Sequence, residues 1–146
     1  MADERRERGM RIRREVLGDE HVDGAIERTD EFTEDFQELI TRYAWGEIWA
    51  RPGLDRRTRS FITLTALVAG NRFGELAMHV RAARRNGVSE DEIKETLLQC
   101  AIYCGVPAAN SAFAIADETL AELRGDGPRE DEEEPRWAQN ARARNC

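Results

Sequence analysis

The sequence predicts an all-α protein of about six helices, and three observations lead to this fold class. Apolar residues recur at helical spacing along most of the chain, and no stretch alternates with the period of a β-strand. Capping residues, glycines and prolines divide the chain into segments of ordinary helix length. With 146 residues, the chain has the size of one domain.

Each predicted helix has its own boundary signals. The first ends near Gly18, and the second ends at Arg51-Pro52-Gly53, because proline restricts the residue before it and glycine permits a turn. The second helix carries apolar residues on one face, at positions 32, 36, 39, 40 and 43. The predicted helices cover residues 3–17, 30–49, 56–69, 73–85, 90–104 and 107–123.

Capping residues fix the later helices. Asp55 can cap the helix over 56–69, which is apolar on most sides, so we expect it to be central and buried. Ser89 and Glu92 have the spacing of a capping box, and Pro107 can occupy the first turn of the last helix. The helical domain is therefore predicted over residues 1–124. Residues 125–146 are charged and are predicted to form a disordered tail, in which Trp137 is either solvated or a docking residue.

Composition excludes several classes of function. The net charge of −7 makes the protein a poor general binder of nucleic acid or of anionic membranes. No apolar stretch is long enough to span a membrane, and the charged N-terminus lacks the apolar region of a signal peptide. Three cysteines at these spacings do not form a disulfide framework. We therefore expect a cytoplasmic protein with no nucleic-acid or membrane partner.

Two segments carry a resemblance to a known family. They are YAWGEIWARPGLDRRTRSFITLTALVAGNR and ELAMHVRAARRNGVSEDEIKETLLQCAIYCGVPAANSAF, within a similarity that covers about residues 14–123. This region resembles the γ-carboxymuconolactone decarboxylase family. The resemblance implies an alkylhydroperoxidase D-like helical bundle that assembles into a ring-shaped homo-oligomer, a hexamer. It also implies cofactor-free conversion of 4-carboxymuconolactone to 3-oxoadipate enol-lactone and carbon dioxide, in the protocatechuate branch of the β-ketoadipate pathway.

The same superfamily contains a redox branch with a Cys-x-x-Cys motif four residues before a histidine. If that histidine corresponds to His79, the two cysteines would fall at Arg72 and Glu75, so both thiols are missing. A thiol peroxidase or disulfide reductase needs a thiolate at its site. The remaining thiol alternative uses Cys100 and Cys104, for which we prefer a structural role. A non-catalytic, ligand-binding oligomer is a third alternative.

The implied substrate explains why no cofactor or metal is expected. As carboxylate leaves, its electron pair flows through the ring double bond to the lactone carbonyl, so the substrate is its own electron sink. The protein must then hold two carboxylates with arginines, stabilise charge on the lactone oxygen and deliver a proton to carbon.

His79 is our first candidate for the acid. Glu75 lies four residues earlier on the same helical face, where a carboxylate would favour the protonated imidazole. Arg72 lies along the same side and is the preferred carboxylate clamp. Arg81 lies on a different face, from which it would serve a neighbouring subunit. The alternative is a surface Glu–His pair without function, and His21 is assigned a structural role.

A second group of candidates follows the apolar segment before Pro52. Glu47 is a candidate second acid and Arg51 a candidate substrate ligand; alternatively, the two form an i,i+4 ion pair. Trp45 is placed over the flat lactone ring, although packing in a core or interface is its alternative role.

Overall fold

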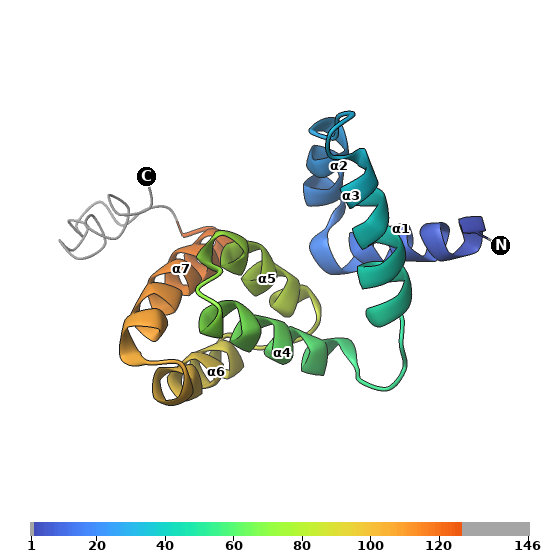
Figure 1. The fold of residues 1–146 in the computed structure, drawn as a ribbon. Helices are drawn as coiled ribbons and strands as arrows, with labels where there is room; N and C mark the ends of the chain where they lie inside the picture. Colours follow the sequence, from blue (N-terminus) through green and yellow to red (C-terminus); the bar gives the residue numbers. More distant parts are fainter. Residues whose placement is uncertain (1, 127–146) are drawn as a thin grey trace.

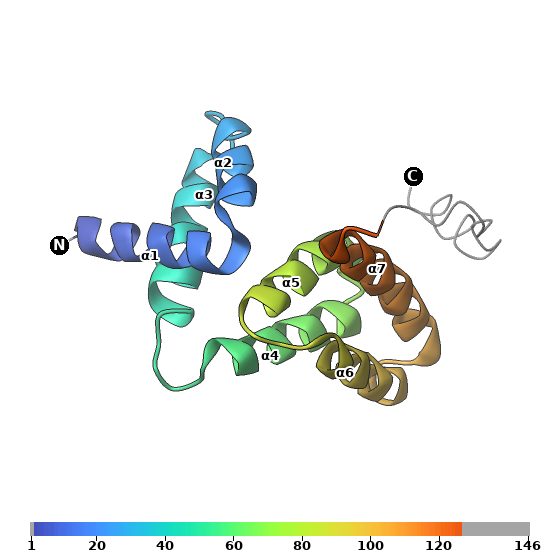
Figure 2. The same cartoon turned by 180° about the vertical axis from the view of Figure 1, so that it is seen from behind.

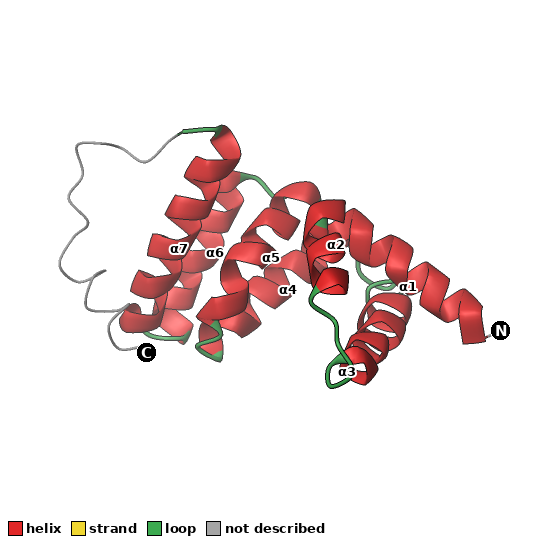
Figure 3. Ribbon diagram, turned by 90° about the horizontal axis from the view of Figure 1, so that it is seen from above, coloured by secondary structure: helices red, strands yellow, loops and turns green. Residues whose placement is uncertain are grey.

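The computed structural model describes residues 2–126 and confirms the all-α prediction (Figures 1 and 3). Within that range the chain forms seven α-helices and one π-helix and no strand. None of these helices is long and apolar enough to cross a membrane. The predicted tail, with Trp137 and Cys146, lies outside the residues described apart from its first two positions. The elements are α1 (Ala2–Leu17), α2 (Asp19–Glu27), α3 (Glu34–Leu39), η1 (Ile40–Ile48), α4 (Arg56–Ala69), α5 (Phe73–Arg85), α6 (Glu90–Tyr103) and α7 (Val106–Arg124).

The helices form two groups, α1 to η1 and α4 to α7, which are connected by a loop after η1 (Figures 1 and 2). A larger core lies among α4 to α7, and a smaller core lies among α1, α2, η1 and one side of α5. α5 belongs to both, because Leu76 and Val80 are buried in the larger core and Ala82 in the smaller. This position of α5 decides where His79 lies.

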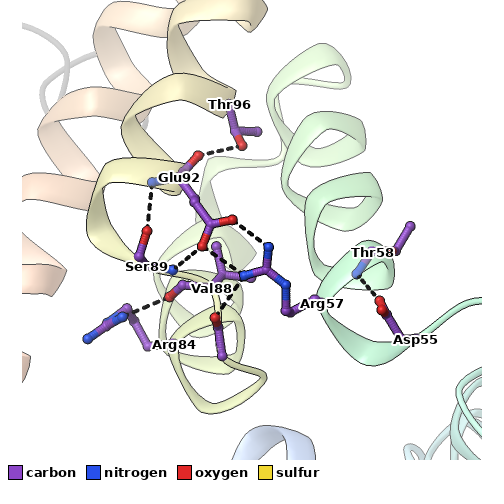
Figure 4. Close-up of polar contacts among 9 residues, drawn as sticks. Asp55, Arg57, Thr58, Arg84, Val88, Ser89, Glu92 and Thr96 are labelled. Atoms are coloured by element: carbon purple, nitrogen blue, oxygen red, sulfur yellow. Dashed lines mark hydrogen bonds and ion pairs between the residues drawn. The ribbon is translucent and has the colours of Figure 1, made fainter.

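Helix ends in the second group are fixed by the residues that the sequence indicates. The Asp55 side chain accepts a hydrogen bond from the Thr58 backbone at 2.7 Å, and Ser89 forms the predicted capping box with Glu92. The network extends across the fold, because Arg57 of α4 donates to both carboxylate oxygens of Glu92, at 2.7 and 2.5 Å (Figure 4). Arg57 lowers the pKa of Glu92 to about 2, with smaller help from hydrogen bonds to Ser89. This network fastens α4 to the start of α6.

The sequence prediction missed α2. Gly18 has φ +88° and was interpreted only as the end of the first helix, whereas it also directs the chain into a new one. The overlooked signal is the spacing of Val22, Ala25 and Ile26, preceded by acidic residues in the first turn. Because α2 carries His21, this omission bears directly on the site.

The predicted second helix is observed as α3 followed by η1, and of the five residues on its predicted apolar face only Ile40 is partly buried. The Trp49 N–H donates to the Ala44 carbonyl at 2.9 Å, the i→i+5 bond of a π-helix. The wider turn directs Thr41 and Trp45 into the smaller core region. Exposed instead are four apolar residues, which we call the N-terminal stripe: Phe32 (94%), Phe36 (59%), Leu39 (53%) and Tyr43 (50%).

Two glycines allow α1 and η1 to cross at backbone contact. A Cβ on Gly9 would collide with the carbonyl oxygen of Thr41, and a Cβ on Gly46 would lie 2.6 Å from the carbonyl oxygen of Arg5. Any side chain at either position would force the helices apart.

The prediction that the helix over 56–69 is central and buried is wrong in part. Ser60, Leu64 and Val68 of α4 are buried, but Ile62 is 53% exposed. Ile62 and the exposed Tyr103 of α6 line one cavity between these helices, and this exposed apolar area is here called the α4–α6 surface. One side of α4 is therefore buried in the larger core, and its other apolar side is exposed to solvent in the described chain.

Candidate active site

His79 lies half-buried in the middle of α5, between the two cores. Its neighbours Met78 and Val80 pack in the smaller and the larger core respectively. Burial lowers the pKa of His79, the positive charge of His21 lowers it further, and Glu75 acts in the opposite direction. The neutral imidazole is therefore the favoured form near pH 7 in the ligand-free chain.

Glu75 lies one turn before His79, as expected, but it does not decide the charge of the imidazole. Its side chain is exposed, so water screens its effect, whereas the imidazole loses much of its hydration. Glu75 does raise the pKa of His79, as expected, but burial lowers that pKa by more.

His21 is the functional candidate that sequence reasoning missed. Arg85 of α5 donates to the Leu17 carbonyl at 3.0 Å, and its guanidinium group lies directly against Gly18. Val22 packs in the same buried cluster as Ala82 of α5. These contacts hold the first turn of α2 on α5 and bring His21 close enough to lower the pKa of His79.

The charges of four arginines, here called the basic cluster, act on His21. Burial is the largest cause of the lowered pKa of His21, followed by the charges of Arg13, Arg28, Arg85 and Arg81, in that order. Arg81, a predicted ligand, also pairs with Glu122 of α7 at 2.5 Å.

Arg13 of the basic cluster is buried, with 4% of its surface exposed. Its guanidinium donates to two uncharged groups, the Thr41 hydroxyl at 3.2 Å and the Gln37 amide oxygen at 2.9 Å. Its Nε has no hydrogen-bond partner within residues 2–126, and burial lowers its pKa. A buried cation without a carboxylate is costly, and a bound anion would offset that cost.

The other predicted site residues lie at varying distances from His79. Trp45 is buried, stacks on Trp49 with ring centroids 5.3 Å apart, and shares the smaller core with Met78. Arg72 is exposed at the N-cap of α5, so it precedes the helix rather than lying on its face.

Glu47 and Arg51 do not form the i,i+4 pair that was considered. Glu47 pairs with Arg5 at 2.5 Å, and Arg51 is exposed in the turn after η1. The carboxylate of Glu47 is therefore engaged by α1 within this chain.

The cavities that we describe lie away from His79. A cavity of about 580 Å³ lies between α4 and α6, and one of about 390 Å³ lies between α6 and α7; His79 lines neither. Cys100 and Cys104 line the larger one as free thiols, and burial raises the pKa of Cys100, which disfavours its thiolate. Within residues 2–126, no group of three or more His, Cys, Asp or Glu residues is arranged to hold a metal ion.

The all-α fold and a family match define the class of protein. The carboxymuconolactone decarboxylase family model matches residues 34–118, more than half of the chain, and the chain therefore belongs to that family.

The chain is 48% identical over 124 residues to 4-carboxymuconolactone decarboxylase of Acinetobacter baylyi, and the match covers 84% of this chain and 92% of that protein. It is 43% identical over 115 residues to nitrosuccinic acid decarboxylase of Metarhizium robertsii, covering 79% and 80%. A 4-carboxymuconolactone decarboxylase of Pseudomonas putida is 50% identical over 44 residues, which are 30% of this chain and 92% of that sequence.

Proposed function

We propose that this protein is a carboxy-lyase that decarboxylates 4-carboxymuconolactone to 3-oxoadipate enol-lactone in the protocatechuate branch of the β-ketoadipate pathway. The observation that carries the proposal is the 48% identity with a 4-carboxymuconolactone decarboxylase over 92% of that protein. The half-buried histidine and the basic cluster support it, because the substrate carries two carboxylates and the reaction ends with a proton transfer to carbon.

The reaction proceeds without a cofactor. Guanidinium groups, Arg81 and Arg72 among them, hold the substrate carboxylates. The bond between the ring carbon and one carboxylate breaks, and carbon dioxide leaves. The electron pair of that bond moves through the ring double bond to the carbonyl oxygen of the lactone. His79, protonated in the complex, donates its proton to the α carbon and regains one from solvent.

The active assembly is a homo-oligomer, a ring-shaped hexamer in which a second subunit completes the pocket at His79. Exposed apolar patches mark interaction sites. The chain has two of them, the N-terminal stripe and the α4–α6 surface. In a closed ring built from head-to-tail contacts, each identical subunit uses one surface to bind the next subunit and a different surface to bind the previous one. A cytoplasmic location remains a prediction from the sequence.

Purified protein should consume 4-carboxymuconolactone, with loss of its ultraviolet absorbance and release of carbon dioxide. His79→Ala should lower kcat by about 10²–10⁴-fold, the usual contribution of a positioned acid, while light scattering shows an unchanged oligomer. Glu95→Ala, an exposed residue of α6, serves as the matched control. A folded, oligomeric wild-type sample without turnover would exclude the proposed function, and near-normal kcat in His79→Ala would remove His79 from the mechanism.

Nitrosuccinic acid is the second candidate substrate, because a decarboxylase that acts on it is 43% identical to this chain. Nitrosuccinate also has two carboxyl groups, and its nitro group can accept the electron pair. The kcat/KM values for the two substrates, measured side by side, decide between them; we expect the lactone to have the higher value.

A further inference from the structure

We propose that His21 is a second functional histidine of this site, which binds a carboxylate of the substrate beside His79 and takes up a proton from solvent as it does so. The inference rests on the proposed function, since it assigns a residue to the recognition of that dianionic substrate.

The position of His21 is built by specific contacts. The Arg85 guanidinium crosses from α5 to the Leu17 carbonyl at 3.0 Å and fills the space beside Gly18, where a Cβ would lie 2.5 Å from Nη2. Val22, the residue after His21, is fully buried in the cluster that includes Ala82. The start of α2 is therefore fixed on α5, and both imidazoles are half-buried at this contact.

The charges around His21 are unbalanced. Of the basic cluster, Arg81 has a carboxylate partner, Glu122, whereas Arg13 and Arg85 donate to uncharged groups and Arg28 has no ion-pair partner within residues 2–126. The acids on α2 do not compensate, because Asp19 and Asp23 both pair with Arg14, at 3.1 and 2.9 Å. A protein with net charge −7 thus gathers positive charge at this contact, which fits a dianion.

Two neutral imidazoles complete this arrangement. Burial lowers the pKa of both histidines, and the charges of the basic cluster lower the pKa of His21 further, so the empty site holds few protons. A dianion would favour the charged form of each ring, and each would accept a proton from solvent. His21 then donates an N–H to a carboxylate, and His79 becomes the acid required for the protonation of carbon. On product release, His21 returns its proton to solvent, so the proton balance closes.

Every charged group that faces this contact enters the titration. They are Arg13 and Arg14 of α1, Asp19, Asp23 and Arg28 of or next to α2, Glu75, Arg81 and Arg85 of α5, and Glu122 of α7. Because the two histidines are the only ones in the chain, imidazole titration isolates them from all these groups.

The decisive experiment is an NMR titration of the histidine rings in the full-length wild-type protein. The probe is the saturated analogue of 4-carboxymuconolactone, which keeps both carboxylates but lacks the ring double bond and so cannot react. We expect the pKa values of both rings to rise by about 1–3 pH units when the probe binds. A probe that binds while the His21 signal keeps its ligand-free titration overturns the inference.

A variant tests the same point by affinity. His21→Gln should raise KM about 10-fold or more, the effect of losing a charged hydrogen bond, and change kcat far less than His79→Ala does. Calorimetry in buffers of different ionisation enthalpy should show fewer protons taken up per probe molecule. Glu20→Gln, an exposed neighbour on α2, is the control. Unchanged KM and proton uptake in folded His21→Gln would contradict the inference.

These results separate the two proposals. Turnover of the lactone by wild-type protein with an unresponsive His21 rejects only the role of His21. Proton uptake at His21 without turnover supports dicarboxylate recognition there and rejects the proposed reaction instead.

Discussion

His79 and Glu75 show what a sequence reveals about a single residue. Their i,i+4 spacing was sufficient to predict a shared face, because helix geometry is local. The charge of His79 was not predictable from that spacing, since it depends on burial between two cores and on His21 from another element. His21 itself was assigned a structural role because nothing near it in sequence indicates that α5 lies against it.

Glu92 provides a residue-scale test of stability. Arg57 holds the pKa of this carboxyl at about 2, below its ordinary value of 4.5. A lowered carboxyl pKa stabilises the fold above pH 4.5, and that stabilisation is lost as the pH falls toward 2. Glu92→Gln should therefore lower the Tm at pH 7, and its difference from wild type should shrink as the pH falls through this window.

Thermal unfolding followed by circular dichroism between pH 7 and pH 2 measures that difference. Glu95→Gln, on the same helix, controls for the loss of one negative charge. A Tm difference for Glu92→Gln that stays constant across the pH range would show that the Arg57 pair does not stabilise the fold.

At the scale of elements, helix boundaries were predictable and helix faces were less so. Capping at Asp55 and Ser89 is decided by neighbouring backbone groups, and the structure confirms both. The segment over 30–49 was predicted as one regular helix. Trp45 of the π-helical part is buried, whereas Phe36 of the preceding α3 is exposed, and the 3.6-residue period cannot reveal this difference.

The crossing of α1 and η1 gives a prediction for that pair of elements. Gly9→Ala should destabilise the protein by about 1–3 kcal/mol, the usual cost of overpacking, because the new methyl group meets the Thr41 backbone. Gly74→Ala in α5 has no atom within 4 Å of its Cβ and should stabilise by about 0.5–1 kcal/mol through helix propensity. Urea unfolding measures both, and equal effects of the two substitutions would refute the close crossing.

At the scale of the whole molecule, the described residues leave several large apolar side chains exposed to solvent. Phe32 is 94% exposed and Phe36 59%, far from the burial expected of phenylalanine. The fold class and the family were accessible from sequence, because they follow from periodicity and motif, whereas the helix count was too low because α2 was missed. Which apolar face stays exposed was not accessible, since it depends on the three-dimensional positions of α3 and η1.

The double variant Phe32→Ser, Phe36→Ser should therefore dissociate the proposed oligomer, because it removes the most exposed part of the N-terminal stripe. Analytical ultracentrifugation would measure the mass, with Glu31→Ser, Asp35→Ser as the control at neighbouring exposed positions. A wild-type protein that sediments as a monomer, or a double variant with the wild-type mass, would show that the stripe is not a subunit contact.

The shared use of α5 by both cores has a consequence for altering specificity. Leu76 and Val80 fix one side of the helix and Ala82 the other, so a change in volume on either side displaces the same backbone. The imidazole of His79 would then move relative to α2, although no residue beside it had been replaced. Substitutions deep in the interior, remote from any ligand, are accordingly a route by which relatives of this fold could shift from one acid substrate to another.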